Sequence, residues 1–331
     1  MRIPTRQGSP VLTSVIPVIE ASNHVRTDET RLVDVASWLA YEELPMPQFL
    51  LPFKPRGDRG DVIDFVMLCA SIDFAFTDFD TRTKFEAAYN GRVWSDSDAL
   101  FVCVGRALEA GDDLCDGNRL RTITAADLSK IFAGNIEMPM ATERAAILLE
   151  IGATLVERYD GRFRHVIDAC SPRLYDGGDG LIDRLVADFS RFRDVSRHAD
   201  HEVAFYKLAQ LAIWMLYTSL EEWGGLRVDD IETMTAFADY IVPAALEVMG
   251  VLSYSDGLAQ AIRNGQLIDP DSPEEVEIRA HTIYAVALLT EEVNARRSAS
   301  SRVIDPQIDA RLWTHFHTTT WPHHLTRTTM Y

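Results

Sequence analysis

The sequence predicts an all-α fold, a compact and irregular helical domain, and three observations support this prediction. Helix-start signals precede two stretches, at Thr124 and at Ser272. Several long segments carry apolar side chains at helical spacing, whereas alternating runs bounded by turns, the pattern of strands, are scarce. No internal repeat is found, which disfavours a helical solenoid.

The first clear helices are predicted between residues 124 and 159. Thr124 and Asp127 form a capping-box pattern before AADLSKIFAG, and Gly134 is placed to end that helix. The segment ATERAAILLEIGATLVERY, residues 141–159, has the length and apolar spacing of the next helix.

A further predicted helix, residues 202–223, is apolar nearly all round, which is typical of a buried helix. Only Lys207 and Gln210 interrupt it, and their spacing of three places them on one face. A buried ammonium group must be paired or lower its pKa. Two interpretations stay open: Lys207 extends from the first turns to water, or Lys207 and Gln210 line a polar pocket.

A single aspartate, Asp239, stands in the otherwise uncharged run TAFADYIVP, residues 235–243. A helical pattern over 231–249 places Asp239 at the edge of an apolar face. Pro243 lacks the N–H that the Asp239 carbonyl would accept, so the chain is expected to kink or restart there. Asp239 is then either an ordinary half-exposed cap or a carboxylate held for chemistry.

The last strong helix signal lies in DSPEEVEIRAHTIYAVALLTEEV, residues 271–293. Ser272 is a natural N-cap, Pro273 suits the first helical position, and Glu275 stands at the reciprocal capping position. Apolar residues then recur at helical spacing, which predicts a helix through this segment.

Glycine and proline cluster in three predicted loops, residues 51–61, 171–180 and 222–227. We expect residues 1–331 to form a single helical domain. If that domain has two lobes, the glycine-rich stretch 171–180 is where they would divide.

Composition bounds the classes of partner. The 50 acidic and 32 basic residues give a net charge of −18, which disfavours direct binding of nucleic acid because phosphates need a Lys/Arg surface. One phosphate on a small ligand needs only two or three basic groups. The apolar run Val11–Ile19 is too short and interrupted for a secretion signal or membrane span, so a soluble cytoplasmic protein is expected. Cysteine and histidine spacings predict neither a disulfide framework nor a metal site.

Two other stretches are dense in potential ligands. The run SIDFAFTDFD, residues 71–80, mixes carboxylates with three phenylalanines, which either fill a core or stack on a heteroaromatic ring. The polar C-terminal segment would be expected to fray, but if ordered it could bring Arg327 to an anion.

A series of motifs runs from about Ser71 to Tyr331: SIDFAFTDFD, ALFVCVGRALEAG, MPMATERAAILLEIG, FRDVS, FYKLAQ, TMTAFADYIVP, LSYSDGLAQAIRNGQLI, EEVEIRA and HHLTRTTMY. In this order the motifs closely resemble the queuosine salvage protein family. The first sixty residues match much less clearly.

The resemblance implies an N-glycosylase that hydrolyses queuosine 5′-monophosphate to queuine, for reinsertion into tRNA, and ribose 5-phosphate. It implies an all-helical fold that is similar in part to DNA glycosylases, with no metal or organic cofactor. The expected partner is therefore a small-molecule substrate, without direct nucleic-acid or membrane binding, and a monomer is favoured.

The resemblance and the chemistry of bond cleavage together suggest the site. Breaking an N-glycosidic bond builds positive charge on the ribose, and Asp239 is expected to stabilise that charge or orient a water. Lys207 is expected to pair with Asp239 or to reach the ribose phosphate, and these two are the predicted catalytic residues. The predicted substrate-binding residues are Asp73, Phe74, Asp194, Tyr240, Arg327 and Tyr331.

Within that set, Asp73, Phe74 and Asp194 would bind the departing base by hydrogen bonds and stacking. Arg327 would bind the 5′-phosphate, because a guanidinium can hold two oxygens at once. Glu277 and Arg279 of the EVEIR run are expected to form a surface or scaffold pair and are left outside the site.

Two positions depart from the family pattern, which has asparagine at Asp73 and often aspartate at Met215. The first puts the contacts to the base edge in doubt, and the second indicates that position 215 is not essential. Two alternatives stay open: a hydrolase of another purine-type nucleotide, and a non-catalytic nucleotide-binding module. In the latter, Lys207 and Asp239 would form only a buried salt bridge.

Overall fold

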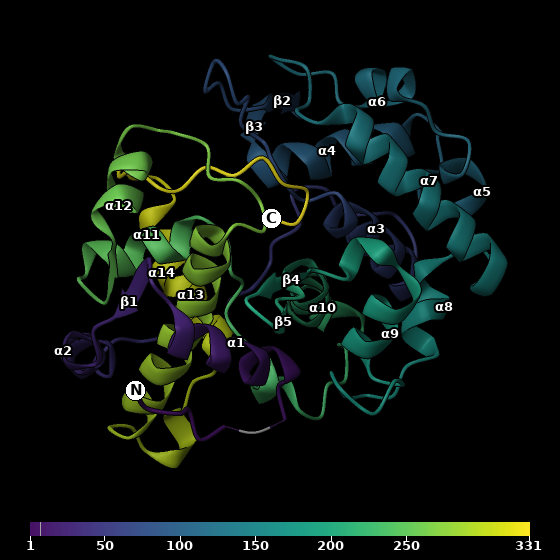
Figure 1. Ribbon diagram of the computed structural model, residues 1–331. Coiled ribbons are helices and arrows are strands. Elements are labelled where there is room, and N and C mark those ends of the chain that lie inside the picture. The colour runs from purple at the N-terminus through teal and green to yellow at the C-terminus, as the bar shows by residue number, and fades with distance from the viewer. Residues whose placement is uncertain (7) are drawn as a thin grey trace. The chain divides into compact units, whose positions relative to one another are not determined.

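The computed structural model describes residues 1–6 and 8–331 and is mostly helical (Figure 1). The α-helices are α1 (Pro10–Ala21), α2 (Glu29–Leu39), α3 (Arg59–Ser71), α4 (Asp96–Glu109), α5 (Gly117–Leu120), α6 (Ala125–Ile131), α7 (Ala141–Arg158), α8 (Phe163–Asp168), α9 (Leu181–Asp188), α10 (Lys207–Ser219), α11 (Ile241–Val248), α12 (Asp256–Arg263), α13 (Pro273–Asn294) and α14 (Asp305–Phe316). The 3-10 helices are η1 (Ser190–Phe192), η2 (Glu221–Trp223), η3 (Ile231–Thr233) and η4 (Ala299–Ser301).

Strands are short and form three two-stranded antiparallel sheets among the described residues. The strands are β1 (Val25–Thr27), β2 (Glu86–Tyr89), β3 (Arg92–Ser95), β4 (Val195–His198), β5 (His201–Ala204) and β6 (Leu252–Tyr254). β1 pairs with β6, β2 with β3, and β4 with β5. The prediction of a mostly helical protein is confirmed, with these small sheets added to it.

The chain divides into two compact units. Unit 1 comprises Met1–Pro47, Asp194–Gln210 and Asp230–Arg327, and unit 2 comprises Gln48–Arg193, Leu211–Asp229 and Thr328–Tyr331. Both units are therefore built from segments that are distant in the sequence. The loop at 171–180 lies within unit 2, and the expectation of a single domain stays a prediction.

Helix α13 forms the centre of unit 1, with α1, α2, α11 and α14 packed around it (Figure 1). Its start confirms the prediction, because the Ser272 hydroxyl accepts the N–H of Glu275 and Pro273 occupies the first helical position. Nearly every residue between Glu275 and Thr290 is buried, polar ones included. Buried polar side chains need partners, so this helix also positions hydrogen-bonding groups inside unit 1.

Unit 2 contains the helices predicted between residues 124 and 159. The Thr124–Asp127 capping box opens α6, and the prediction of a helix from residue 141 is confirmed by α7. Aromatic side chains help fill this unit: the Phe65 ring on α3 packs against Phe53 and Phe101, with ring centroids 5.3 and 5.5 Å away.

The prediction of a helix beginning at Glu202 is wrong at its start. Residues 201–204 form β5, which pairs with β4, and the Ala204 N–H donates to the Ser14 hydroxyl at 3.0 Å. These partners satisfy the backbone groups that a helix would otherwise use. Helix α10 begins only at Lys207, so this lysine lies at the helix start instead of in its second turn.

The restart expected near Pro243 is confirmed, so the helical pattern over 231–249 does not form one continuous helix. Residues 234–240 are irregular, and α11 begins at Ile241. Pro243 is the third helical residue, where a backbone N–H has no intrahelical acceptor, so its missing donor costs little. Asp239 therefore lies in the irregular segment just before α11, which the periodicity could not indicate.

No helix in residues 1–6 and 8–331 is both long and apolar enough to cross a membrane.

Candidate active site

The irregular segment Met234–Tyr240 is attached to the rest of unit 1 by side chains from three helices. From α10, the Gln210 amide oxygen accepts the Thr235 N–H at 2.9 Å, and its nitrogen donates to the Thr235 hydroxyl at 3.0 Å. The same nitrogen donates to the Phe205 carbonyl at 3.0 Å. Gln210 is fully buried, so its bonds are protected from water. Instead of lining a pocket, Gln210 holds the segment that contains Thr235 against the start of α10.

Two further bonds hold the segment just before Asp239. From α14, a carboxylate oxygen of Asp309 accepts the Phe237 N–H at 2.9 Å. From α13, the Arg279 Nε donates to the Ala238 carbonyl at 3.3 Å. The backbone that carries Asp239 is thus fixed by contacts from distant parts of the sequence.

Asp239 is both a cap and a perturbed carboxylate. One of its oxygens accepts the N–H groups of Ile241 and Val242, at 2.8 and 3.0 Å, and so caps the start of α11. Its side chain is partly accessible. Burial by surrounding protein raises the pKa of Asp239, while the positive charge of Lys207 and the two backbone bonds oppose that rise. The two interpretations of Asp239 as a cap or as a chemical group are therefore compatible.

Lys207, the first residue of α10, is only 7% exposed. The interpretation in which it extends to water is disfavoured by that burial. Its charge lowers the pKa of two carboxyl groups, Asp239 and Asp309, in each case against a larger effect of burial. The predicted catalytic pair thus lies close enough to interact electrostatically within unit 1.

Asp309 is a site residue that the sequence interpretation missed. It is 4% exposed, and burial together with the charge of Asp239 holds its pKa well above the ordinary value. Burial and the neighbouring carboxylate both act against ionisation of Asp309, while the charge of Lys207 favours it. The signal in the sequence is an acidic residue beside Ile308 and Leu312, on the apolar face of a helical run.

Asp194 and Arg279 form a buried bidentate ion pair. The Arg279 guanidinium donates to both Asp194 oxygens, at 3.0 and 2.5 Å, and one of these oxygens also accepts the Lys207 N–H at 3.2 Å. The expected pair of Glu277 with Arg279 is wrong as to its partner, because Arg279 pairs with Asp194. A scaffold role of Arg279 agrees with this pairing, although the pair is buried and not on the surface. The predicted binding of the base by Asp194 stays a prediction, with both oxygens already engaged.

Glu277, the other residue set aside with Arg279, has a separate structural role. It is fully buried, and its carboxylate accepts the backbone N–H groups of Asn23, His24 and Val25. His198 lies 3.2 Å from the same carboxylate. Glu277 therefore orders the chain that leads into β1.

Tyr240 and Arg327 lie at more open positions of unit 1. The Tyr240 ring stacks on His323, with centroids 4.5 Å apart and planes at 28°, and the charge of His323 lowers the pKa of Asp239. Arg327 is exposed. The C-terminal segment is ordered here, since the Ile268 N–H donates to the Leu325 carbonyl at 2.7 Å. Tyr240, stacked on its histidine, directly follows Asp239 in the chain.

Comparisons with known proteins assign the chain to a family. The family model described as "Queuosine salvage protein" matches residues 53–331. A Sphaerobacter thermophilus protein is 34% identical over 325 residues, which cover 97% of each chain. The chain belongs to the queuosine salvage protein family. Relatives of this queuosine salvage protein include one from Bos taurus, 28% identical over 77% of this chain and 72% of its own length. Another, from Nematostella vectensis, is 32% identical over 70% and 66%.

These three relatives carry the name queuosine 5′-phosphate N-glycosylase/hydrolase. The predicted family resemblance is confirmed, and it extends further toward the N-terminus than the motifs indicated. The family model begins at residue 53, before the first motif at Ser71, and the Sphaerobacter relative matches nearly the whole length.

The other predicted site residues of this queuosine salvage protein, Asp73, Phe74 and Tyr331, lie in unit 2 and are buried. Two guanidinium groups lie over the Phe74 ring, that of Arg144 at 4.1 Å and that of Arg191 at 4.8 Å from its centroid. The predicted binding of the base by these residues stays a prediction.

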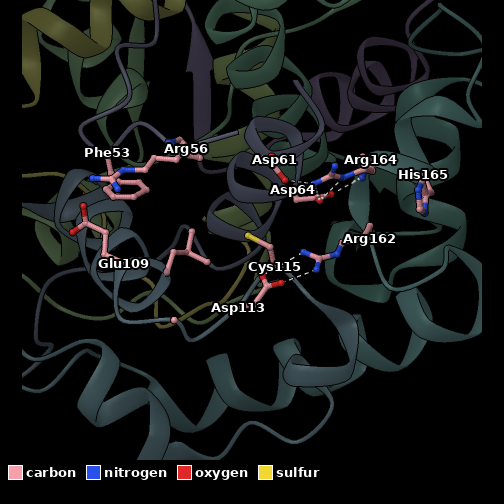
Figure 2. Close-up of a pocket in the computed structure, with 13 residues that line it drawn as sticks. Phe53, Arg56, Asp61, Asp64, Glu109, Asp113, Cys115, Arg162, Arg164 and His165 are labelled. Atoms are coloured by element: carbon pink, nitrogen blue, oxygen red, sulfur yellow. Dashed lines mark hydrogen bonds and ion pairs between the residues drawn. The ribbon is translucent and has the colours of Figure 1, made fainter. Parts of the chain in front are cut away.

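A cavity of about 830 Å³ in unit 2 contains none of the predicted site residues (Figure 2). Two of its arginines are paired with carboxylates of the lining: Arg164 contacts Asp61 and Asp64, and Arg162 contacts Asp113, each at 2.6 Å (Figure 2). Among the described residues, no cluster of three or more His, Cys, Asp or Glu side chains is arranged to bind a metal.

Replacing Asp309 with asparagine is expected to change how stability depends on pH. Burial and the charge of Asp239 raise the pKa of Asp309 in the folded protein well above the ordinary pKa at which the unfolded chain ionises it. Wild-type stability should therefore fall as pH rises between those two values, by about 1.4 kcal/mol per pH unit for this group. Asparagine keeps an acceptor for the Phe237 N–H and removes the titration.

Urea unfolding midpoints of both proteins between pH 4.5 and 7.5 measure this difference. Asp309→Asn should gain stability relative to wild type as pH increases. Parallel curves would show that Asp309 is ionised normally in the folded state.

Proposed function

We propose that this queuosine salvage protein hydrolyses the N-glycosidic bond of queuosine 5′-monophosphate and releases queuine and ribose 5-phosphate. The observation that carries the proposal is the match over 97% of the chain to a relative named for this activity. The arrangement of Asp239 beside the charge of Lys207 supports it, because a carboxylate held by a cation suits a reaction that builds positive charge on a sugar.

In the proposed reaction, Asp239 acts in its ionised form at the ribose C1′. As the bond from C1′ to the base breaks, the bond electrons leave with the base and the ribose becomes oxocarbenium-like. Asp239 stabilises that charge or accepts a proton from the attacking water. The hydroxide of the water joins C1′, and its proton ends on the departing base. A 7-deaza base lacks a ring nitrogen at which purines are commonly protonated. Stabilisation of the positive charge on the sugar therefore contributes a larger share of the transition-state stabilisation.

Lys207 and Asp309 set the protonation of Asp239 in this proposal. The ammonium of Lys207 favours the carboxylate form of Asp239 against burial. Burial and the charge of Asp239 raise the pKa of Asp309 well above its ordinary value, which favours the protonated form of Asp309. In the proposal, Asp239 is the member of the pair that acts as an anion.

Substrate binding in unit 1 is proposed for Tyr240 and Arg327. Tyr240 follows Asp239 directly and presents an aromatic ring already stacked on His323. Arg327 is an exposed guanidinium suited to a terminal phosphate. His323 is an addition to the residues expected from sequence.

Base release measured by chromatography tests the proposed activity. Purified protein should release queuine from queuosine 5′-monophosphate, with little release from guanosine 5′-monophosphate under the same conditions. Equal or faster release of guanine would favour the alternative of a general purine nucleotide hydrolase. Binding of the nucleotide without any release during long incubation would favour the non-catalytic module.

The remaining expectations belong to the same proposal. Queuine release would serve tRNA modification from the cytoplasm, with the protein acting as a monomer on a small molecule. A partial likeness of the fold to DNA glycosylases is part of it too, since both reactions cleave the bond between a base and its sugar.

A further inference from the structure

Asp194 organises the turn that leads into α10. Its backbone carbonyl accepts the N–H groups of Phe205 and Tyr206, at 2.9 and 3.2 Å. Its carboxylate accepts the N–H of Lys207 at 3.2 Å. Tyr206 has a left-handed backbone, with φ of 47°, which a tyrosine adopts only where its surroundings hold it. The position of Lys207 is therefore set by Asp194.

Arg279 connects that turn to the segment carrying Asp239. Two of its guanidinium nitrogens donate to the Asp194 carboxylate, and its Nε donates to the Ala238 carbonyl at 3.3 Å. Its guanidinium also lies 3.9 Å over the Phe205 ring. One rigid, planar group thus contacts both the turn before α10, through Asp194 and Phe205, and the residue before Asp239.

We propose that Asp194 and Arg279 are positioning residues that set Lys207 and Asp239 relative to one another. This inference rests on the proposed function, because it concerns the two residues to which catalysis is assigned. Neither Asp194 nor Arg279 needs to touch the substrate for this role. Their pairing fixes the main chain before Lys207 and before Asp239. The Lys207 ammonium therefore lies where it can keep the Asp239 carboxylate ionised.

Fold stability alone is a weaker account of this ion pair. Burying two charges carries a large desolvation penalty, and apolar side chains of similar volume often stabilise a core as well or better. What apolar side chains cannot supply is a set of donors pointing in two fixed directions. The geometry of the pair therefore fits alignment of the site more closely than general stability.

Helix α13 supplies a matched control in Glu277. Like Arg279 it is buried and charged, and it lies two residues earlier on the same helix. Its partners are the backbone N–H groups of residues 23–25 and His198, not the segment carrying Asp239. Loss of its charge should weaken the fold without displacing the site.

The test compares Arg279→Lys, Asp194→Asn and Glu277→Gln by steady-state kinetics on queuosine 5′-monophosphate and by thermal unfolding. A displacement of catalytic groups by about 1 Å can cost about 10²-fold in rate. We expect both site variants to lose about that much in kcat, with KM within about threefold of wild type. The double variant should lose little more than the worse single variant, since the pair acts as a unit. Glu277→Gln should lower the Tm and keep kcat.

A second measurement does not depend on activity. Hydrogen–deuterium exchange should quicken in peptides covering 205–210 and 234–242 of Arg279→Lys, and in those covering 23–27 of Glu277→Gln. Arg279→Lys keeps the positive charge at position 279, and this variant alone is sufficient for the test if Asp194→Asn does not fold. Unchanged kcat and exchange in Arg279→Lys, or a kcat loss in Glu277→Gln equal to that of the site variants at the same fall in Tm, would overturn the proposal. Absence of base release by wild type would instead refute the proposed function, with the exchange result still deciding the positioning role.

Discussion

Asp239→Asn is expected to reduce the release of queuine from queuosine 5′-monophosphate by roughly 10³-fold, as removal of a dominant electrostatic group does in other enzymes. Asparagine has nearly the same shape but carries no negative charge to stabilise the developing positive ribose. It retains an oxygen that can accept the N–H groups of Ile241 and Val242, so the cap of α11 should persist. Base release at substrate saturation is the measurement.

Asp28→Asn is the matched control for this change. Asp28 caps α2 in the same way, accepting the N–H groups of Thr30 and Arg31 in unit 1. It should keep full activity with a similar small change in Tm. If Asp239→Asn retained wild-type kcat, Asp239 would have no part in the chemistry and would be a structural cap like Asp28.

Lys207→Met is expected to lower kcat/KM near neutral pH by about 10²-fold and to move its acid limb to higher pH. Burial raises the pKa of Asp239, and Lys207 is the largest influence opposing that rise. Without the ammonium the pKa rises further, so at a given pH less of Asp239 is ionised. Methionine has a similar length and suits the buried environment, which should limit the effect on folding.

The pH profile of kcat/KM for Lys207→Met separates the two roles left open for this lysine. A loss that is equal at every pH, with an unmoved acid limb, would contradict its role in ionising Asp239. If Lys207 instead binds the phosphate, the loss should disappear when the nucleoside queuosine replaces the nucleotide. Lys84→Met, which removes an exposed lysine 2.8 Å from Asp96, should match wild type in both measurements.

Local signals predicted the helix starts well. Thr124 and Ser272 cap their helices as expected, because an N-cap depends on residues only two or three positions away. The apolar spacing of residues 141–159 likewise predicted α7 nearly to its ends. These features are determined within one or two helical turns, so the sequence contains all the information they need.

Periodicity failed where other partners replace helical hydrogen bonds. Residues 201–204 form a hairpin with the neighbouring strand β4 and bond to the distant Ser14, and residues 235–238 bond to side chains of α10, α13 and α14. Both segments have helix-compatible sequences. Their backbone groups instead form hydrogen bonds outside a helix, and these tertiary contacts override the weak local preference for a helix.

The candidate site shows the same division. Asp239 and Lys207 were found because they are charged residues in apolar stretches, where burial of a charge costs free energy. Their catalytic roles were predicted from the resemblance to the family. Asp309 and the Asp194–Arg279 pair were not assigned to catalysis or alignment, because a charged residue in a helix resembles a surface residue until its neighbours are known.

By itself, the sequence determined the helical class, the cap positions, the family and the two residues at the centre of the proposed chemistry. Only the tertiary structure decided that Asp239 lies in an irregular segment, that Lys207 begins its helix, and that Asp309 shares their environment. The physical reason is that a pKa and the alignment of two side chains depend on burial and on partners brought together by folding. The spacing of residues along the chain contains no information about burial or about these partners.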